Sequence, residues 1–212
     1  PHLRVSLEDK DYGFIVIIDD GRQELSDYET MILTHASTAL KLIAQKYISN
    51  MEIETRYRDG FVQDIVLNNI KSLQEVVKRG KIYGWDLSEK FYTAVIVDID
   101  DFKIQYLNIR SKEDSETIEK HNDDIFDYSL KFFRRFFKTV LYTKFTDSTA
   151  FIIKHDKPDE ATAQKILSCC NTLKGELQAA YNFTVTIGIS EPKGSIMDCH
   201  IAYQEAQKAV KI

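Results

Sequence analysis

A long segment of the chain, residues 26–59, contains neither proline nor glycine, and Gly60 follows it. Ser26 and Glu29 have the spacing of a capping box, in which both side chains bond to backbone N–H groups at a helix start. The sequence therefore predicts a helix of about 30 residues over 26–58. Apolar residues repeat along it at spacings of three and four: Leu33, Ala36, Leu40, Ile43 and Tyr47. A narrow seam of this kind is typical of a connector that pairs with its twin in a homodimer, and packing on its own domain is the alternative.

Two strands are expected before this helix. Residues 3–8 alternate between apolar and polar, residues 13–19 form a β-branched run, and Asp9–Tyr12 reads as the polar turn of a hairpin. A hairpin alone is only marginally stable in water. We therefore expect 1–22 to belong to a sheet whose other strands come from an earlier part of a longer protein or from a partner chain. The chain opens on Pro1 rather than Met, which fits a piece cut from something larger.

Further helices are expected after the long one. Charged residues crowd the end of the predicted long helix: Glu52, Glu54, Arg56, Arg58 and Asp59. A shorter helix is predicted from Phe61 to Asn69. Ser72 and Glu75 make a second capping box, and the helix it opens is predicted to stop at Gly84, because glycine is favoured just past a helix end. Residues 23–83 are thus predicted to be a helical connector.

From Trp85 the pattern changes to alternating strands and helices. The expected elements are a strand over 91–98, a helix over 115–138, strands over 140–144 and 150–154 around the turn Thr146-Asp147-Ser148, a helix over 159–180, a strand over 184–189 and a helix over 198–211. This order predicts an α+β domain over 84–212, in which an antiparallel sheet carries helices on one face. It has the split βαβ character of ferredoxin-like folds.

Composition excludes several classes of protein. The 28 basic and 33 acidic residues give a net charge of −5, which does not fit a globally basic nucleic-acid binder. The longest apolar run, Phe91 to Val97, is far shorter than the roughly 20 residues of a membrane span, and no targeting segment is visible. Three cysteines without metal-ligand spacing (Cys169, Cys170 and Cys199) are expected to be buried free thiols, which favours a reducing, cytoplasmic setting.

Basic and aromatic residues alternate in the predicted helix over 115–138. Lys131, Arg134, Arg135 and Lys138 alternate with Phe132, Phe133, Phe136 and Phe137. Such a pattern superficially resembles a nucleic-acid surface. Since the four phenylalanines share one helical face, we expect them to pack in the core behind a solvated basic face.

Strand 91–98 ends in the string Val97-Asp98-Ile99-Asp100-Asp101-Phe102-Lys103. Carboxylates that leave the edge of a sheet next to a lysine can hold Mg²⁺ and a nucleotide phosphate. The alternative is an ordinary strand end that turns into solvent, where aspartate is common.

This string resembles the first-strand motif of GGDEF domains, the diguanylate cyclase fold. The resemblance implies that Asp98 binds metal and that a later hairpin carries Gly-Gly-Asp/Glu-Glu-Phe. Here that hairpin reads Phe145-Thr146-Asp147-Ser148-Thr149-Ala150. One register puts Asp147 at the third, metal-binding position, and a shift by one residue puts Ser148 there.

The motif is degenerate in either register. Both glycines are absent, the fourth-position acid becomes Ser148 or Thr149, and the asparagine that reads guanine is replaced by Tyr106. Because GTP needs close backbone approach at the glycines, side chains there obstruct it. We therefore expect no enzyme activity, no catalytic residues and no cofactor. The alternative is a nucleotide-binding or catalytic domain that uses Asp98 and Asp147 for Mg²⁺ and Lys103 for phosphate.

A second resemblance covers more of the chain. The stretch VVKRGKIYGWDLSEKFYTAVIVDID, residues 76–100, is similar to the entry into the degenerate GGDEF-like domain of PucR/CdaR-type bacterial transcription regulators. The stretch IGISEPKGSIMDCHIAYQEAQKAV, residues 187–210, resembles the end of that domain, where a glycine-containing strand precedes a Tyr-x-Glu-Ala helix. The hairpin and long helix resemble the end of a GAF-like sensor domain. In this family a helix-turn-helix DNA-binding domain follows, which is expected beyond Ile212.

The resemblance implies a cytoplasmic regulatory fragment with three parts. Residues 1–22 are expected to be the last strands of a GAF-like sensor, 23–83 the connector, and 84–212 a GGDEF-like regulatory domain. Such a fragment is expected to relay a signal from an unknown small-molecule effector and to form a homodimer through the connector. It is expected to reach DNA only through the missing domain and to have no membrane partner.

Overall fold

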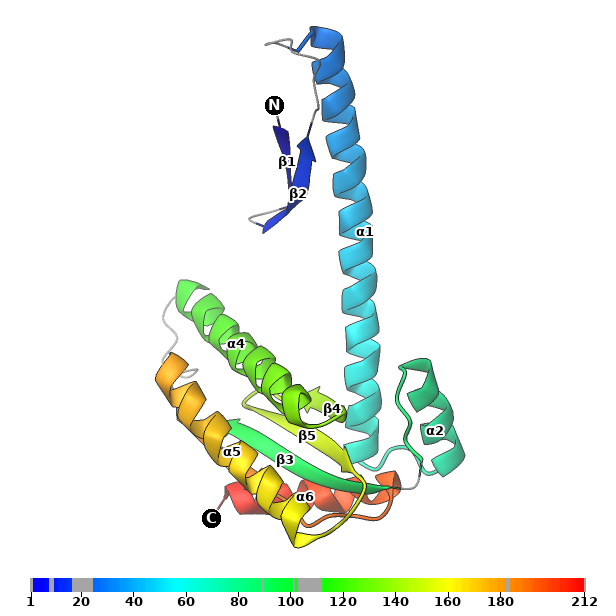
Figure 1. The fold of residues 1–212 in the computed structure, drawn as a ribbon, viewed down its shortest axis with the longest axis vertical. Coiled ribbons are helices and arrows are strands. Elements are labelled where there is room, and N and C mark those ends of the chain that lie inside the picture. The colour runs from blue at the N-terminus through cyan, green and yellow to red at the C-terminus, as the bar shows by residue number, and fades with distance from the viewer. Residues whose placement is uncertain are drawn as a thin grey trace. The chain divides into compact units, whose positions relative to one another are not determined.

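The computed structural model of the chain describes residues 2–7, 10–16, 25–88, 90–100, 102, 112–181 and 184–211 (Figure 1). The chain falls into two compact units, Pro1–Tyr57 and Arg58–Ile212. The first unit holds a hairpin and most of a long helix, and the second holds a four-stranded sheet with its helices.

The hairpin of the first unit is formed by β1 (His2–Leu7) and β2 (Lys10–Val16), which pair antiparallel. The expected turn over Asp9–Tyr12 is wrong, because Leu7 already pairs with Lys10 and only two residues connect the strands. The end of the predicted second strand, residues 17–19, lies outside the described residues. Val5 is buried, whereas Tyr12, Phe14 and Val16 are exposed.

The long helix is α1 (Asp27–Val66), which has 40 residues. The predicted capping box is confirmed: the Ser26 N–H donates to Glu29 Oε2 at 2.8 Å, and the Glu29 N–H donates to Ser26 Oγ at 3.3 Å. The predicted break near Gly60 is wrong, because the helix continues through this glycine. Burial of Phe61 and Val62 offsets the cost of about 1 kcal/mol that a glycine imposes inside a helix.

Crossing a membrane requires a long, strongly apolar helix. Neither α1 nor any other helix in the described part of the chain has such a stretch.

Helix α2 (Leu73–Ile82) begins and ends as predicted. Ser72 is its N-cap, and the Ser72 side chain accepts a hydrogen bond from the Glu75 N–H. Past its end, Gly84 has a φ of +73°, the left-handed conformation that favours glycine. The N–H groups of Gly84 and Trp85 donate to the carbonyls of Lys81 and Gly80, which is the Schellman pattern of a helix C-terminus.

The second unit is built on one antiparallel sheet. Its strands are β3 (Phe91–Ile99), β4 (Thr139–Lys144), β5 (Ser148–His155) and β6 (Val185–Ile189). Their order is β4-β5-β3-β6, with β3 in the interior. The helices are α4 (Lys112–Phe136), α5 (Glu160–Tyr181) and α6 (Cys199–Val210), and a short 3₁₀ turn over Ile196–Asp198 precedes α6. The predicted α+β class and antiparallel sheet are confirmed.

Helices cover both faces of this sheet, so the prediction of helices on one face is wrong. Val95 and Val97 lie in a core with residues of α4 and α5, whereas Ala94 and Ile96 lie in a core with the end of α1, α2 and α6. In Figure 1, α4 and α5 lie side by side over one face and α6 lies behind the sheet. The sequence of β3 indicates this arrangement, since an uninterrupted apolar strand is typical of burial on both faces of a sheet.

The three cysteines are buried free thiols, as predicted. Cys169 and Cys170 lie on the buried side of α5, and Cys199, the first residue of α6, lies in the core. Burial raises the pKa of the Cys170 thiol to about 12, and it raises the pKa of Cys199 as well. These thiols are therefore protonated and unreactive at neutral pH.

Candidate functional site

The candidate site lies where the interior strand β3 ends. Asp98, the last residue but one of β3, is opposite Ser148 of β5 on one side and opposite Thr186 of β6 on the other. Beyond it, the Asp100 N–H donates to the Thr184 carbonyl at 3.1 Å, and Asp100 Oδ1 accepts from the Thr186 hydroxyl at 2.7 Å. Asp98 and Asp100 are therefore held by backbone pairing with the neighbouring strand segments.

The hairpin between β4 and β5 forms one wall of the site. The predicted strand pair is confirmed, with residues 145–147 connecting the strands and Ser148 starting β5. The Phe145 N–H donates to the Ser148 carbonyl at 2.8 Å, which closes the hairpin. The Ile99 N–H donates to the Asp147 carbonyl at 3.1 Å, which joins the hairpin to the end of β3.

These elements enclose a pocket of about 730 Å³. Its lining consists of Ile96, Asp98, Ile99, Asp100, Phe102, Asp147, Ser148, Thr186, Tyr203, Gln207, Val210 and Lys211. The sequence pattern did not identify Thr186, Tyr203 or Gln207 as pocket residues. Tyr203 and Gln207 are one helical turn apart on α6, and this spacing is the signal that places them on one face. Burial and the nearby Asp147 raise the pKa of the Tyr203 hydroxyl, so it is a hydrogen-bond donor at neutral pH.

Two of the three residues of the predicted magnesium and phosphate site meet in this pocket. Asp98 and Asp147 both line it, as does Ser148, the residue of the alternative register. The predicted phosphate ligand Lys103 lies outside the described residues, and so does Tyr106. Within the described ranges, no group of three or more His, Cys, Asp or Glu side chains could hold a metal ion. The described residues therefore supply a pair of carboxylates rather than a complete cation site.

Bulky side chains stand at the hairpin positions where the GGDEF motif would have glycine. In the register that puts Asp147 third, these positions are Phe145 and Thr146. The Phe145 ring stacks on the Tyr203 ring, with centroids 5.5 Å apart. The Phe145 side chain at this position is thus part of an aromatic pair with α6.

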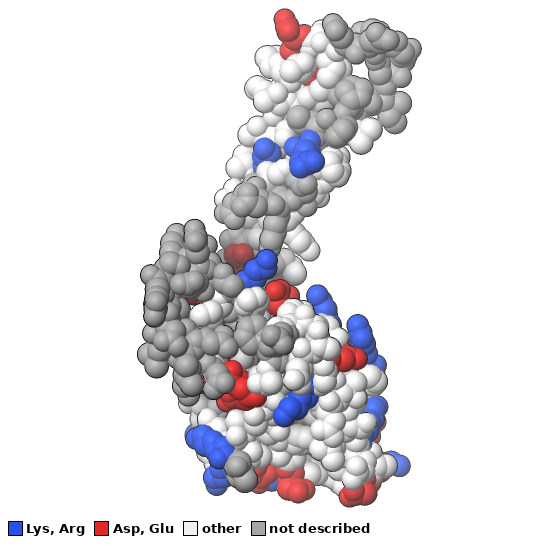
Figure 2. Space-filling model, turned by 90° about the vertical axis from the view of Figure 1, so that its left-hand side faces the viewer, with Lys and Arg blue, Asp and Glu red and all other residues white. Residues whose placement is uncertain are grey.

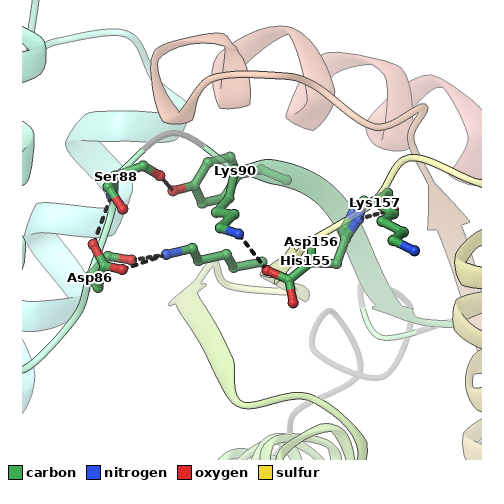
Figure 3. A network of polar contacts seen from close by, with 8 residues as sticks. Asp86, Ser88, Lys90, His155, Asp156 and Lys157 are labelled. Atoms are coloured by element: carbon green, nitrogen blue, oxygen red, sulfur yellow. Dashed lines mark hydrogen bonds and ion pairs between the residues drawn. The ribbon is translucent and has the colours of Figure 1, made fainter.

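A polar network at the opposite end of β3 fixes the entry to the strand (Figure 3). Asp86 Oδ1 accepts from the Ser88 N–H at 3.1 Å, and Lys154 Nζ lies 3.2 Å from Asp86 Oδ2. Hydrogen bonds from the Ser88 side chain and backbone, together with Lys154, lower the pKa of Asp86 to about 2. Lys90 and Asp156 form a second ion pair at 2.8 Å. The network ties the segment before β3 to the end of β5.

A histidine also lies at this end of the sheet. His155 Nδ1 lies 2.8 Å from the Lys157 carbonyl, to which its N–H can donate, and His155 Nε2 lies 2.9 Å from the Thr93 hydroxyl. In a neutral ring whose Nδ1 carries the hydrogen, Nε2 accepts a hydrogen bond from the Thr93 hydroxyl. Both ring nitrogens have protein partners, so this histidine is satisfied as a structural residue.

The basic and aromatic stripe of α4 is largely a core feature, as predicted. Phe132, Phe133 and Phe137 are buried, but Phe136 is 44% exposed, so one of the four phenylalanines was wrongly assigned to the core. Lys131, Arg134, Arg135 and Lys138 are exposed. On the larger body in Figure 2, coloured Lys and Arg side chains are interspersed with Asp and Glu. The charged side chains on the face that Figure 2 shows are thus of both signs, unlike the one-sided basic face of a nucleic-acid binder.

The fold and the pocket define an α+β domain with β-α-β-β-α-β-α order and acidic residues at the end of an interior strand. The chain belongs to the GGDEF-like domain family, because the family model described as GGDEF-like domain matches residues 68–212. A solved structure of a sensory box/GGDEF family protein from Caulobacter crescentus CB15 is similar, with 12% identity and a TM-score of 0.38. The match covers 65% of this chain and 86% of that chain. No curated protein matches the sequence.

Proposed function

We propose that the chain is the signal-relay and dimerisation part of a cytoplasmic transcription regulator of the PucR/CdaR type. In this proposal 1–22 are the last strands of a GAF-like sensor, 23–83 are the connector, and 84–212 are a regulatory domain without enzyme activity. A helix-turn-helix domain of the same regulator contacts DNA. The resemblance of 76–100 and 187–210 to this group supports the proposal, as does membership of the GGDEF-like family.

The proposed relay role is supported by the end of α1, which packs into the core of the second unit. Phe61 and Val62 are both 0% exposed and belong to the core cluster that also contains Val76 of α2 and Ala202 of α6. The Phe61 ring stacks on Trp85 at 6.3 Å, and the Arg79 guanidinium lies 4.5 Å from the Phe61 ring centroid. A movement of this end of α1 therefore requires the core to repack. An effector can act through such a helix by favouring one of two packings.

The exposed apolar residues of α1 support the homodimer. Leu40, Ile43 and Tyr47 of the predicted seam are 43%, 65% and 65% exposed. Further large apolar side chains on the same helix are exposed as well, and Leu42 among them lies off the seam: Tyr28, Met31, Ile32, Leu42, Met51, Ile53 and Tyr57. A stable interface buries about 800 Å² per partner, and a helix of this length and apolarity can supply such an area. A second copy is the natural partner because a helix seam pairs with itself across a two-fold axis.

Light scattering on the full-length regulator tests this proposal. It is expected to give the mass of a dimer, and a strictly monomeric regulator would contradict it. The gene is also expected to encode a helix-turn-helix after residue 212, and a different sequence there would remove the transcription role.

The pocket favours one second candidate, a nucleotide-binding or catalytic GGDEF domain. Magnesium commonly uses one or two protein carboxylates and completes its shell with water and substrate phosphates. Asp98 and Asp147 line one pocket of about 730 Å³, which is large enough for a nucleotide. Calorimetry with GTP and Mg²⁺ separates the two candidates. Saturable binding that Asp98→Ala abolishes would establish this second function.

A further inference from the structure

A direct hydrogen bond joins α1 to the edge of the sheet beside the pocket. Asp59 Oδ1 accepts from the backbone N–H of Lys144 at 3.0 Å, although the two residues are 85 positions apart in sequence. Lys144 is the last residue of β4, an outer strand of the sheet. A carboxylate is a strong acceptor for a backbone N–H. Asp59 thus occupies the place that a neighbouring strand would otherwise take.

The Lys144 side chain fixes the same point from the other face of the sheet. Lys144 Nζ pairs with the carboxylate of Asp123 on α4, and it lies 4.8 Å from the centroid of the Phe126 ring. The end of β4 is therefore held between α1 and α4.

The hairpin that walls the pocket begins directly after Lys144. Phe145 closes the hairpin through its N–H bond to the Ser148 carbonyl, and the Asp147 carbonyl receives the Ile99 N–H of β3. Asp147 and Ser148 line the pocket opposite the end of β3. Asp59 is thus connected to the pocket wall through Lys144 and the short hairpin.

We propose that Asp59 is a positioning residue that couples the position of α1 to the hairpin wall of the pocket. The use of this coupling as a relay rests on the proposed function. A slide of α1 by one residue moves the Asp59 backbone by about 1.5 Å, which lengthens or misaligns the 3.0 Å hydrogen bond to Lys144. The anchor of the hairpin on α1 is then weakened. Because coupling between two sites is reciprocal, a ligand that moves the hairpin also acts on α1.

Single-residue amide hydrogen exchange, measured by NMR on the full chain, tests this coupling. Asp59→Ala is expected to raise exchange at Lys144 roughly tenfold, and at Phe145 and Ile99 by at least about threefold. Asp59→Asn retains an acceptor oxygen and is expected to remain close to the parent protein. Asp59→Ser provides a second loss of the contact in case the alanine variant does not fold.

The matched control is Asp64→Ala, on the same helix. Asp64 accepts from Asn69 Nδ2 and lies 3.8 Å from Arg79, away from the hairpin contacts. The Asp64→Ala variant is expected to leave amide exchange at Lys144, Phe145 and Ile99 unchanged. None of the variants is expected to change amide exchange at Tyr92. Increased exchange confined to Lys144, or an equal increase in the Asp64 variant, would overturn the coupling.

The oligomeric state of the same samples keeps this result separate from the proposed function. A monomer in which Asp59→Ala still raises exchange at Phe145 and Ile99 supports the coupling and contradicts the dimeric regulator. A dimer in which these amides do not respond overturns the coupling alone.

Discussion

Gly188 of β6 lies so close to α6 that a Cβ atom on residue 188 would be 2.1 Å from the carbonyl oxygen of Ala206. A backbone oxygen cannot move away as the end of a flexible side chain can. The close approach lets α6, which carries the pocket residue Tyr203, pack directly on β6. It also gives a physical reason for the glycine in this strand.

Gly188→Ala is expected to lower the free energy of unfolding by about 2 kcal/mol or more, because α6 must shift to admit the methyl group. Gly175→Ala is the control, since a Cβ there meets nothing within 4 Å inside α5. The control is expected to raise the stability by about 0.5–1 kcal/mol, because alanine is the better helix former. Urea unfolding measures both changes. Equal effects from the two substitutions would contradict the close packing.

Thr143 and Thr93 provide a second matched pair. Both are buried strand residues, 0% and 3% exposed. The Thr143 hydroxyl has no hydrogen-bond partner among the described residues, whereas the Thr93 hydroxyl bonds to His155 Nε2. Thr143→Val is expected to leave the free energy of unfolding unchanged or raise it by about 1 kcal/mol, because it removes an unsatisfied polar group. Thr93→Val is expected to lower it by about 1–2 kcal/mol. The opposite order in chemical denaturation would show that Thr143 has a partner.

The acid stability of the second unit is expected to depend on Asp86. The Ser88 hydrogen bonds and Lys154 lower the folded-state pKa of Asp86 from 3.8 to about 2. A carboxylate whose pKa is lower in the folded state stabilises the protein above its unfolded pKa, and this contribution is lost as the pH falls. The stability difference between the parent and Asp86→Asn is therefore expected to be full above about pH 5 and to be lost progressively between about pH 5 and pH 1. Urea unfolding at several pH values checks this, and a difference that does not change with pH would contradict it.

Local signals in the sequence predicted the starts of α1 and α2 and the end of α2. The capping boxes at Ser26 and Ser72 and the glycine past α2 could be read directly, because each depends on residues only a few positions apart. The order of strands and helices after residue 84 followed from apolar periodicity for the same reason. The pairing of Asp98 with the hairpin could be anticipated only through the GGDEF resemblance.

Features that depend on distant residues were missed. The helix continues through Gly60 because Phe61 and Val62 reach a core formed by much later strands. The hydrogen bond from the Lys144 N–H to the Asp59 carboxylate has no local signature, since the two residues meet only after the sheet has formed. Exposure of Phe136 likewise depends on where α4 ends against its neighbours, and helical periodicity alone does not give this.

Sedimentation velocity on the full chain tests the account's central claim, that α1 joins two copies through its seam. The parent protein is expected to sediment as a dimer, and Leu40→Lys as a monomer, because a charge at the seam must be buried without a partner. Leu42→Lys is the matched control, since Leu42 is 62% exposed and lies off the seam. We expect it to remain dimeric. A parent protein that stays monomeric over the accessible concentration range, or a Leu40→Lys variant that stays dimeric, would contradict the account.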